Sequence, residues 1–330
     1  MFNKPFRMNQ AGTFAGVLAA GFLMTAGVAV AADGVSVKQV GDKVRVEIGG
    51  ELFTEYHYQD ASKPFLYPVL GPGELPMTRN WPMEEAPGED RDHPHHRSLW
   101  YAHGDVNGVD LWSEAANAGR TVHAEFLKLS SGPKEGVIQT LNRLESKEGK
   151  VLGTDVRTMT FSAPGDVKII DFDITVKASH GDLVFGDTKE GTMALRLTET
   201  MRLKPNKENV GKPTGHIVNS EGVTDGATWG KRAKWVDYTG PVEGQTVGVA
   251  IFDHPGNPRH PTWWHVRDYG LFGANPFGIH DFERKPAGTG DYTIPSGESR
   301  TWHYRIVLHA GDTDAAGVAK LYDAYATGTR

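Results

Sequence analysis

Alternation of apolar and polar residues is the feature of this sequence that most constrains its fold. Apolar residues stand two apart in several segments, most clearly in 43–48, 168–177 and 302–308. Side chains of a strand point alternately to the two faces of its sheet, so this pattern predicts strands with one buried face. The 40 glycines and 19 prolines separate such runs as turns. Many antiparallel strands in one chain of this size favour an all-β fold, a large antiparallel β-sandwich.

One helix is predicted, a short one at the C-terminus. Thr313 can cap its start, and Val318, Leu321 and Tyr322 lie on one apolar stripe at helical spacing. The sequence shows no fixed repeat and no linker of biased composition. We therefore expect residues 32–330 to form a single domain.

Residues 1–31 have the pattern of a secretory signal peptide. Lys4 and Arg7 precede an uncharged apolar run over 11–30, and Ala29-Val30-Ala31 supplies the small-x-small cleavage pattern. The run is also long enough for a single membrane anchor, which is the alternative. We expect cleavage and a periplasmic or secreted protein with no membrane association afterwards, because no later segment is long and apolar enough to span a bilayer.

Composition excludes several function classes. The chain has no cysteine, which removes thiol catalysis, cysteine zinc sites and disulfides from consideration. Its formal net charge of −6 becomes −8 once the two charges of Lys4 and Arg7 leave with the signal peptide. A mildly acidic chain argues against a nucleic-acid partner, which usually requires a basic face. The sequence does not set the oligomeric state.

Segment 91–114 concentrates histidine, arginine and tryptophan more than any other part of the chain. A stable core does not require such a set, and histidine is the usual residue for proton transfer near neutral pH and for metal ligation. We expect a strand from Pro94 through His103, a turn over 104–108 and a second strand over 109–112. The candidate site residues of this segment are Arg91, His93, His95, His96, Arg97, His103 and Trp112.

Three interpretations of these histidines remain open. They could act as general acid and base, with Asp92 or Asp110 orienting an imidazole. They could bind a divalent metal, through His93, His95 and a more distant His103 or His265. They could also be ordinary members of a polar loop layer. No cofactor other than such a metal is indicated.

A second cluster over 253–269 resembles the first in composition. It follows an apolar run that is typical of a buried strand, and its three prolines predict an irregular rim segment, where binding groups are often placed. Two adjacent tryptophans in extended chain point to opposite faces, so at least one could stack on a sugar. Its candidate substrate-binding residues are Asp253, His254, Arg259, Trp263, Trp264 and His265.

Glu199 is the candidate carboxylate. It follows an apolar alternation over 195–198 in a predicted strand. It is either a solvent-facing residue or, if it faces the histidines, a general base.

Three runs of the sequence resemble a known bacterial family. They are PFLYPVLGPGELPMTRNWPM, DHPHHRSLWYAHGDVNGVDLW and FDHPGNPRHPTWWHVRDYGLFGANPF, and they are similar to the family DUF6807. That family also carries the label "methane oxygenase PmoA". The label implies a multi-span membrane enzyme, which a chain without a later span does not match.

The chain is also remotely similar to the galactose mutarotase-like supersandwich proteins, through the run ending in His103-Gly104, the closure on Trp112 and the ending IPSGESRTWHYRIVLHAGD. This resemblance implies a β-supersandwich that binds sugars on a concave face. It would make His96 or His103 the acid and Glu199 the base. The C-terminal glutamate of the epimerases has no counterpart, because Glu298 lies in a predicted turn.

The sequence therefore predicts an exported carbohydrate-active protein. It would use histidine acid–base chemistry on a sugar or another small polar substrate, as an epimerase, lyase or hydrolase. The alternatives are a metal-dependent enzyme with the same histidines as ligands, a non-catalytic carbohydrate-binding protein and a structural envelope protein. The composite site depends on both clusters converging in one pocket.

Overall fold

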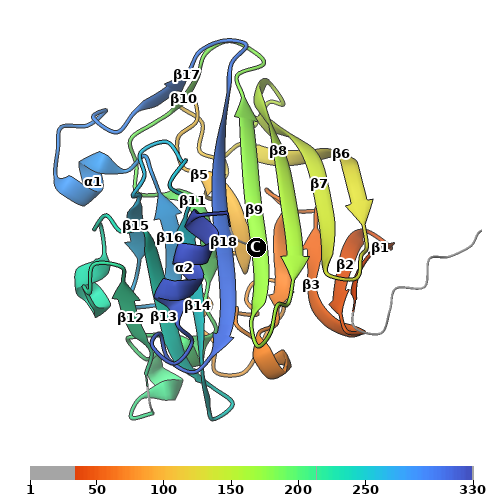
Figure 1. Cartoon of the computed structure of the whole chain (residues 1–330). Coiled ribbons are helices and arrows are strands. Elements are labelled where there is room, and N and C mark those ends of the chain that lie inside the picture. The colour runs from red at the N-terminus through yellow and green to blue at the C-terminus, as the bar shows by residue number, and fades with distance from the viewer. Residues whose placement is uncertain (1–33, 213, 329–330) are drawn as a thin grey trace, which may run out of the picture.

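The structure, a computed structural model, describes residues 34–212 and 214–328. The predicted signal peptide over 1–31 lies outside these residues. Two eight-stranded antiparallel sheets pack face to face as a sandwich (Figure 1). The predicted all-β antiparallel sandwich is confirmed.

The first sheet has the order β1-β2-β3-β4-β5-β11-β16-β15. Its interior strand β11 pairs with β5 and with β16, so segments distant in sequence become neighbours. The strands are β1 (Val35–Val40), β2 (Lys43–Ile48), β3 (Glu51–His57), β4 (Phe65–Val69), β5 (Leu99–His103), β11 (Gly191–Arg196), β16 (Leu271–Asn275) and β15 (Trp263–Val266).

The second sheet has the order β12-β13-β14-β18-β9-β8-β7-β6. Its strands are β12 (His216–Asn219), β13 (Trp235–Val242), β14 (Gln245–Asp253), β18 (Ser299–Ala310), β9 (Lys168–Lys177), β8 (Val151–Ser162), β7 (Glu135–Glu145) and β6 (Arg120–Ser130). A separate pair joins β10 (Leu183–Phe185) to β17 (Tyr292–Ile294). Short 3-10 turns cover Pro72–Glu74, Glu199–Met201, Lys207–Asn209 and Asp225–Thr228.

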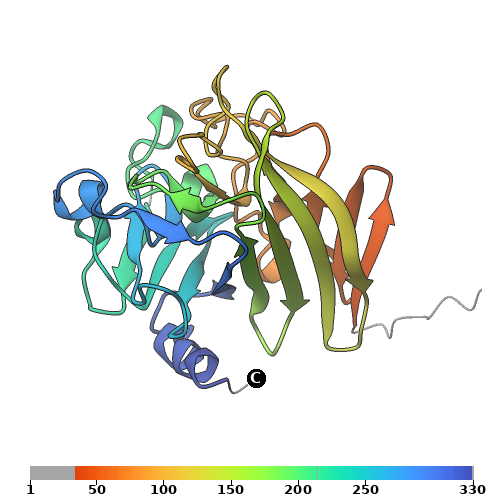
Figure 2. The same cartoon turned by 90° about the horizontal axis from the view of Figure 1, so that it is seen from above.

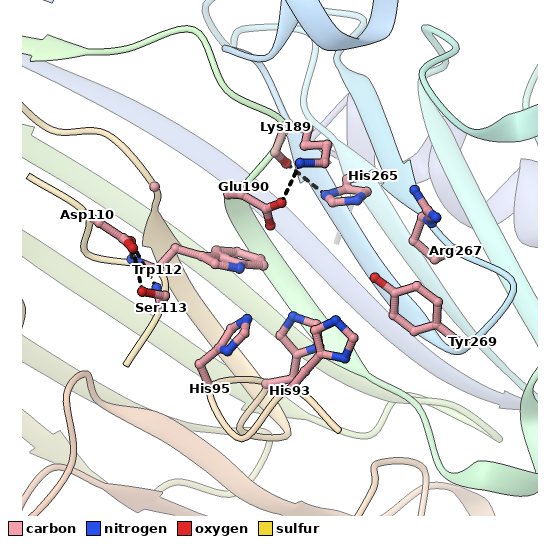
Figure 3. A pocket seen from close by; sticks show the side chains of 12 residues that line it. His93, His95, Asp110, Trp112, Ser113, Lys189, Glu190, His265, Arg267 and Tyr269 are labelled. Atoms are coloured by element: carbon pink, nitrogen blue, oxygen red, sulfur yellow. Dashed lines mark hydrogen bonds and ion pairs between the residues drawn. The ribbon is translucent and has the colours of Figure 1, made fainter. Parts of the chain in front are cut away.

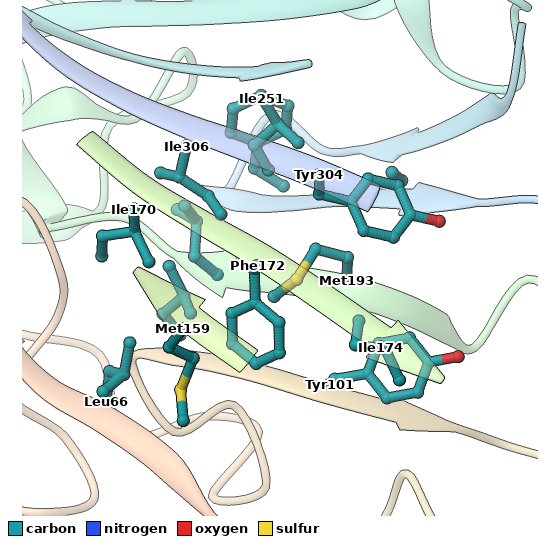
Figure 4. Close-up of a cluster of buried hydrophobic side chains, with 14 of the residues drawn as sticks. Leu66, Tyr101, Met159, Ile170, Phe172, Ile174, Met193, Ile251, Tyr304 and Ile306 are labelled. Atoms are coloured by element: carbon teal, nitrogen blue, oxygen red, sulfur yellow. The ribbon is translucent and has the colours of Figure 1, made fainter. Parts of the chain in front are cut away.

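The predicted alternation places the core between the sheets. In β9 the apolar residues Ile170, Phe172, Ile174 and Val176 are buried, while the polar residues between them are partly exposed. Figure 4 shows Ile170, Phe172 and Ile174 meeting side chains of the first sheet, such as Met193. Burial of this apolar surface is the main favourable contribution to folding.

The predicted C-terminal helix is confirmed as α2 (Val318–Ala326). Figure 2 shows α2 against the outer face of the second sheet. Its buried residues Val318 and Tyr322 pack there on Phe252 and other apolar groups. Thr313 does not cap it: the helix begins after Gly317, and the Thr313 hydroxyl donates instead to Asp237. A second short helix, α1 (Ile279–Glu283), was not predicted.

Two local strand predictions are wrong. The strand expected from Pro94 begins only at Leu99, because His93 and Ser98 have positive φ and the chain between them turns. The strand expected over 109–112 is reduced to one bridge between Val106 and Val109. Within the described part of the chain, no helix is long and apolar enough to cross a membrane.

Candidate functional site

An open pocket of about 470 Å³ lies on the outer face of the first sheet. Strand β5 defines this face, since Leu99 and Tyr101 point into the core while Trp100 and Ala102 point to the opposite side. Figure 3 shows side chains from four separate segments around the pocket. They are His93, His95, His96, Gly104, Asp110, Trp112, Ser113, Lys189, Glu190, His265, Arg267 and Tyr269.

Four flat rings form a continuous stack at one wall. Tyr269 stacks on His93 at 5.3 Å between ring centroids, and His93 stacks on His96 at 4.7 Å. His96 in turn stacks on Trp100 at 5.3 Å. The turn over 93–98, rather than the predicted strand, allows this arrangement. It brings His93, His95 and His96 together, whereas strand alternation would have separated His96 from the other two.

The carboxylate of Asp92 holds the turn over 93–98 in place. It accepts from the buried Arg79, from Arg196 at 2.9 Å and from His93 at 2.9 Å. Burial alone would raise the pKa of Asp92, but the hydrogen bond from His93 and the charges of Arg196 and Arg79 outweigh it and hold the pKa well below its usual range. The predicted orienting role of Asp92 toward a histidine is present in this geometry.

Three imidazoles of the pocket are held uncharged at neutral pH. Burial, with smaller contributions from Lys63 and His93, lowers the pKa of His95 to about 4. Burial and Arg267 lower the pKa of His265 to about 3. Burial, followed by the charges of His95 and Arg196, also lowers the pKa of His96 well below its usual value. An uncharged imidazole donates from one nitrogen and accepts at the other.

The tautomers of His96 and His265 follow from their partners. Arg196 can only donate, so at 3.2 Å from its Nη1 the Nδ1 of His96 accepts, and the proton is on Nε2. The Lys189 carbonyl can only accept, so the Nδ1 of His265, 2.8 Å away, carries the proton and Nε2 holds the lone pair. The pocket is therefore lined by one imidazole with an N–H donor at Nε2 and one with an acceptor there.

Lys189 and Glu190 complete the pocket, and sequence reasoning missed both. They form an ion pair at 2.7 Å and lie directly before β11, an interior strand of the first sheet. Figure 3 shows them across the pocket from His93 and His95. Only the pairing of β11 with β5 brings them there, so no local pattern could have indicated them.

Of the predicted aromatic platforms only Trp112 lines this pocket, and it is 2% exposed and packs against Trp100 and His96. The backbone around it turns because Asp110 accepts from the amides of Trp112 and Ser113 at 2.8 and 2.9 Å. Asp110 thus holds a loop and does not orient a histidine. Beneath the loop, the buried Lys63 donates to the Trp112 carbonyl at 2.8 Å.

The two predicted arginines of this segment lie outside the pocket. Arg91 is exposed and pairs with Glu85 at 2.8 Å. Arg97 forms a two-point ion pair with Glu114, at 2.6 and 2.9 Å. Arg97 and Glu114 instead line a neighbouring cavity.

The structure places His103 and Glu199 away from the pocket. His103 continues the core-facing side of β5, lies against Phe185 and Phe277, and bonds through Nε2 to the Gly186 carbonyl at 2.7 Å. Glu199 lies in a 3-10 turn beyond β11, buried against Arg202. Burial raises the pKa of Glu199, against the opposing hydrogen bond and charge of Arg202. The strand predicted through Glu199 is therefore wrong, because β11 ends at Arg196.

The second cluster converges on the pocket only through His265 and the residues that follow it. Asp253 is buried and holds its own loop, accepting from Asn257 and His260 at 2.7 Å each. His254 lies on the outer face of the second sheet, beside His303 and Tyr325. The predicted composite of the whole second cluster with the first is therefore wrong.

Arg259 and the two adjacent tryptophans have structural partners. Arg259 donates to three backbone carbonyls, those of Pro276, Gly290 and Asp291. Trp264 is in the core and donates to the Ala233 carbonyl, whereas Trp263 is on the opposite face and donates to Glu283 of α1. The predicted opposite orientation is confirmed, but α1 covers Trp263 and neither ring lines the pocket.

The histidine set suggested for a metal is not assembled. His93 and His95 are close, with ring centroids 5.7 Å apart, but His103 faces the other side of the sheet. Across residues 34–212 and 214–328, no group of three or more His, Asp or Glu side chains is arranged to hold a metal ion.

Comparison with solved structures returns distant similarities. A galactose mutarotase related enzyme from Lactobacillus acidophilus is 11% identical, with a TM-score of 0.29 over 83% of this chain and 97% of that chain. A galactose mutarotase-like protein from Lactobacillus casei ATCC 334 is 8% identical, with a TM-score of 0.34 over 84% and 100%. The galactosidase domain of an alpha-galactosidase–sucrose kinase is 8% identical, with a TM-score of 0.37 over 84% and 41%.

These TM-scores are too low to support a functional argument, and no curated protein matches the sequence. The family comparison is clearer. A family model described as "Family of unknown function (DUF6807)" matches residues 43–323, which is most of the chain. The resemblance noted in the sequence is thereby confirmed, and the chain belongs to the DUF6807 family.

Proposed function

We propose that this protein is a carbohydrate-active enzyme that transfers a proton within the pocket on the first sheet. One observation carries the proposal: a carboxylate, Glu190, shares a pocket with two uncharged imidazoles, His96 and His265, whose tautomers are fixed. In this scheme Glu190 is the base. The Nε2–H of His96 donates to the substrate oxygen on which negative charge develops.

The uncharged state of the imidazoles decides this assignment of roles. With a pKa of about 4, only about one His95 in a thousand is protonated at pH 7. Such a histidine is a poor general acid at neutral pH. An uncharged imidazole N–H can still polarise a substrate oxygen, as enzymes with a buried neutral histidine do. We therefore assign the role of proton acceptor to Glu190, since the other carboxylate of the pocket, Asp110, holds its own loop.

The aromatic groups support a sugar as the substrate. Trp112 and Tyr269 both line the pocket, beside polar groups on the remaining walls. Ring faces beside a few placed polar groups are the usual composition of a small-molecule site. Hydrogen atoms on one face of a sugar ring would pack on such a surface, and its hydroxyls would reach Lys189 and the imidazoles.

We also propose that the protein acts in the periplasm or outside the cell. The apolar run over 11–30 and the Ala29-Val30-Ala31 pattern support this. N-terminal sequencing of the protein from its native host tests it. A mature chain that starts at Ala32 is expected, and an intact Met1 would overturn the proposal.

Incorporation of solvent deuterium at a substrate carbon tests the enzymatic proposal. Methyl glycosides of neutral and acidic hexoses are incubated with the protein in D₂O, and loss of each carbon-bound proton signal is followed by NMR. Exchange at one carbon is expected for the wild-type protein, and Glu190→Gln should lower its rate at least a hundredfold. Glu85→Gln, an exposed carboxylate outside the pocket, is the matched control.

Two outcomes would overturn the proposal. If Glu190→Gln exchanges as fast as the wild-type protein, the carboxylate is not the base. If sugars bind in calorimetry but none exchanges, the protein is a non-catalytic carbohydrate-binding protein.

A further inference from the structure

We infer that the substrate is a sugar acid whose carboxylate is bound by Arg267. This inference rests on the proposed function, since it names the substrate class of the same pocket. Arg267 lines the pocket with His265, two residues before it on the same side of the chain. Figure 3 shows His265 between Glu190 and Arg267.

Arg267 differs from the other arginines around the site because its guanidinium has neither a carboxylate nor a carbonyl partner among the described residues. Among the described residues, no carboxylate forms an ion pair with it, and its guanidinium lies over the rings of Tyr269 and Trp229, at 5.5 and 5.9 Å from their centroids. The other nearby arginines have partners. Arg79, Arg97, Arg196 and Arg202 pair with carboxylates, and Arg232 and Arg259 donate to backbone carbonyls. Arg267 is thus a guanidinium held in place by aromatic rings with its hydrogen-bond donors left for a ligand.

The acidic groups of the pocket are already engaged. Glu190 pairs with Lys189 at 2.7 Å. Asp110 accepts from two backbone amides of its own loop and from the Ser113 hydroxyl. Neither is free to neutralise Arg267, so a bound carboxylate would complete the charge balance. A guanidinium binds a carboxylate through two parallel hydrogen bonds, which also fixes its orientation.

A second guanidinium contacts the ring that holds Arg267. Arg196 lies 4.8 Å from the centroid of Tyr269, but it is paired with Asp92. Burial first, and then the charge of Arg267, lowers the pKa of His265, as expected for a positive local potential.

A carboxylate at Arg267 gives the proton transfer a definite position. Glu190 would take the proton from the carbon that carries the carboxylate, which is C5 of a hexuronate. The C–H electron pair moves onto the carboxylate oxygens, where Arg267 and the Nε2–H of His96 stabilise the second negative charge. Return of a proton from the protein to either face of C5 restores the uronate or gives its C5 epimer. The cycle needs no oxidant, reductant or second substrate.

The test compares matched sugars that differ only in the carboxylate. Methyl α-D-galactopyranosiduronate and methyl α-D-galactopyranoside, with the corresponding gluco pair, are followed by NMR in D₂O. Loss of the C5 proton signal is expected for the uronates alone. Arg267→Gln should reduce the exchange rate per enzyme at least tenfold, and Arg267→Lys should recover part of it.

Arg91→Gln is the control, because it removes one positive charge at an exposed position outside the pocket. Thermal unfolding of each variant shows whether it folds. Calorimetric titration with methyl α-D-galactopyranosiduronate is expected to show binding that weakens at least tenfold in Arg267→Gln and not in Arg91→Gln.

The two proposals fail in different ways. Exchange on neutral glycosides that is indifferent to Arg267→Gln would overturn the sugar-acid assignment and leave the proton-transfer proposal intact. Uronate binding that depends on Arg267, with no exchange on any sugar, would overturn the enzymatic proposal and uphold the ligand class. Equal binding of uronate and neutral glycoside, or none of either, would overturn the ligand class.

Discussion

Two buried histidines should make the stability of this protein fall as the pH drops below neutral. Burial lowers the pKa of His103 to about 4 and that of His265 to about 3, whereas an unfolded chain has a histidine pKa near 6.5. Between these values the unfolded chain binds more protons than the folded one. Acidification therefore favours unfolding, and the contribution of each histidine to this loss grows until the pH reaches its folded pKa.

The expected size follows from linkage. Lowering the pH from 7 to 5.5 reduces the free energy of unfolding by about 1.2 kcal/mol for each histidine that is protonated only in the unfolded chain, and so by about 2.5 kcal/mol for the pair. A double variant can remove both titrations and keep both hydrogen bonds. In His103→Gln the amide nitrogen replaces the Nε2 donor to Gly186, and in His265→Asn it replaces the Nδ1 donor to Lys189.

Urea unfolding at both pH values measures the effect. Between pH 7 and 5.5 the free energy of unfolding should fall by about 2.5 kcal/mol less in the double variant than in the wild-type protein. This holds whatever the stability of the variant at pH 7. A matched control is His180→Gln, at an exposed position, which should leave the pH dependence unchanged. An identical pH dependence in the wild-type protein and the double variant would refute the argument that these imidazoles are buried uncharged.

Three further changes test the packing and the role of Trp112. Gly191→Ala would place a Cβ 2.5 Å from Nδ1 of the His103 ring, so we expect the free energy of unfolding in urea to fall by about 1–3 kcal/mol. The control Gly226→Ala meets no atom within 4 Å and should leave stability unchanged. Equal stability of the two variants would contradict the packing. Tyr322→Ala removes a buried ring of α2 from the second sheet and should cost about 3 kcal/mol by the same assay, and a loss below about 1 kcal/mol would argue against tight docking of α2. Trp112→Ala should weaken methyl glycoside binding in calorimetry at least tenfold, and unchanged affinity would remove Trp112 from the site.

The fold was predictable because apolar and polar residues alternate along a strand when one face of its sheet is buried and the other is exposed. In β9 and β18 the apolar residues repeat every second position, and a strand is the one regular structure that brings such residues to one side. The helix α2 was predictable for the same reason, at helical period. Signals of this kind identify an element and its buried face, but they do not identify its neighbour in the sheet.

The site was predictable only where it is local. The histidine-rich segment contributes three lining residues, yet its shape is a turn whose backbone depends on contacts of Asp92 with Arg79 and Arg196. His103 belongs to the same run but faces the core, because alternation along β5 places it on the same side as Leu99 and Tyr101. Glu190 and Lys189 carry no local pattern at all, since strand order alone places them opposite the histidines.

The position of β18 has a consequence for how the chain reaches this structure. Although it is the last strand in sequence, it lies between β14 and β9 in the middle of the second sheet (Figure 1). Until residues 299–310 arrive, two long strands present unpaired backbone edges, the kind of surface on which chains aggregate. Late closure by this strand predicts slow folding dominated by distant contacts. Any truncation that removes it would leave two half-sheets, and not a shortened sandwich.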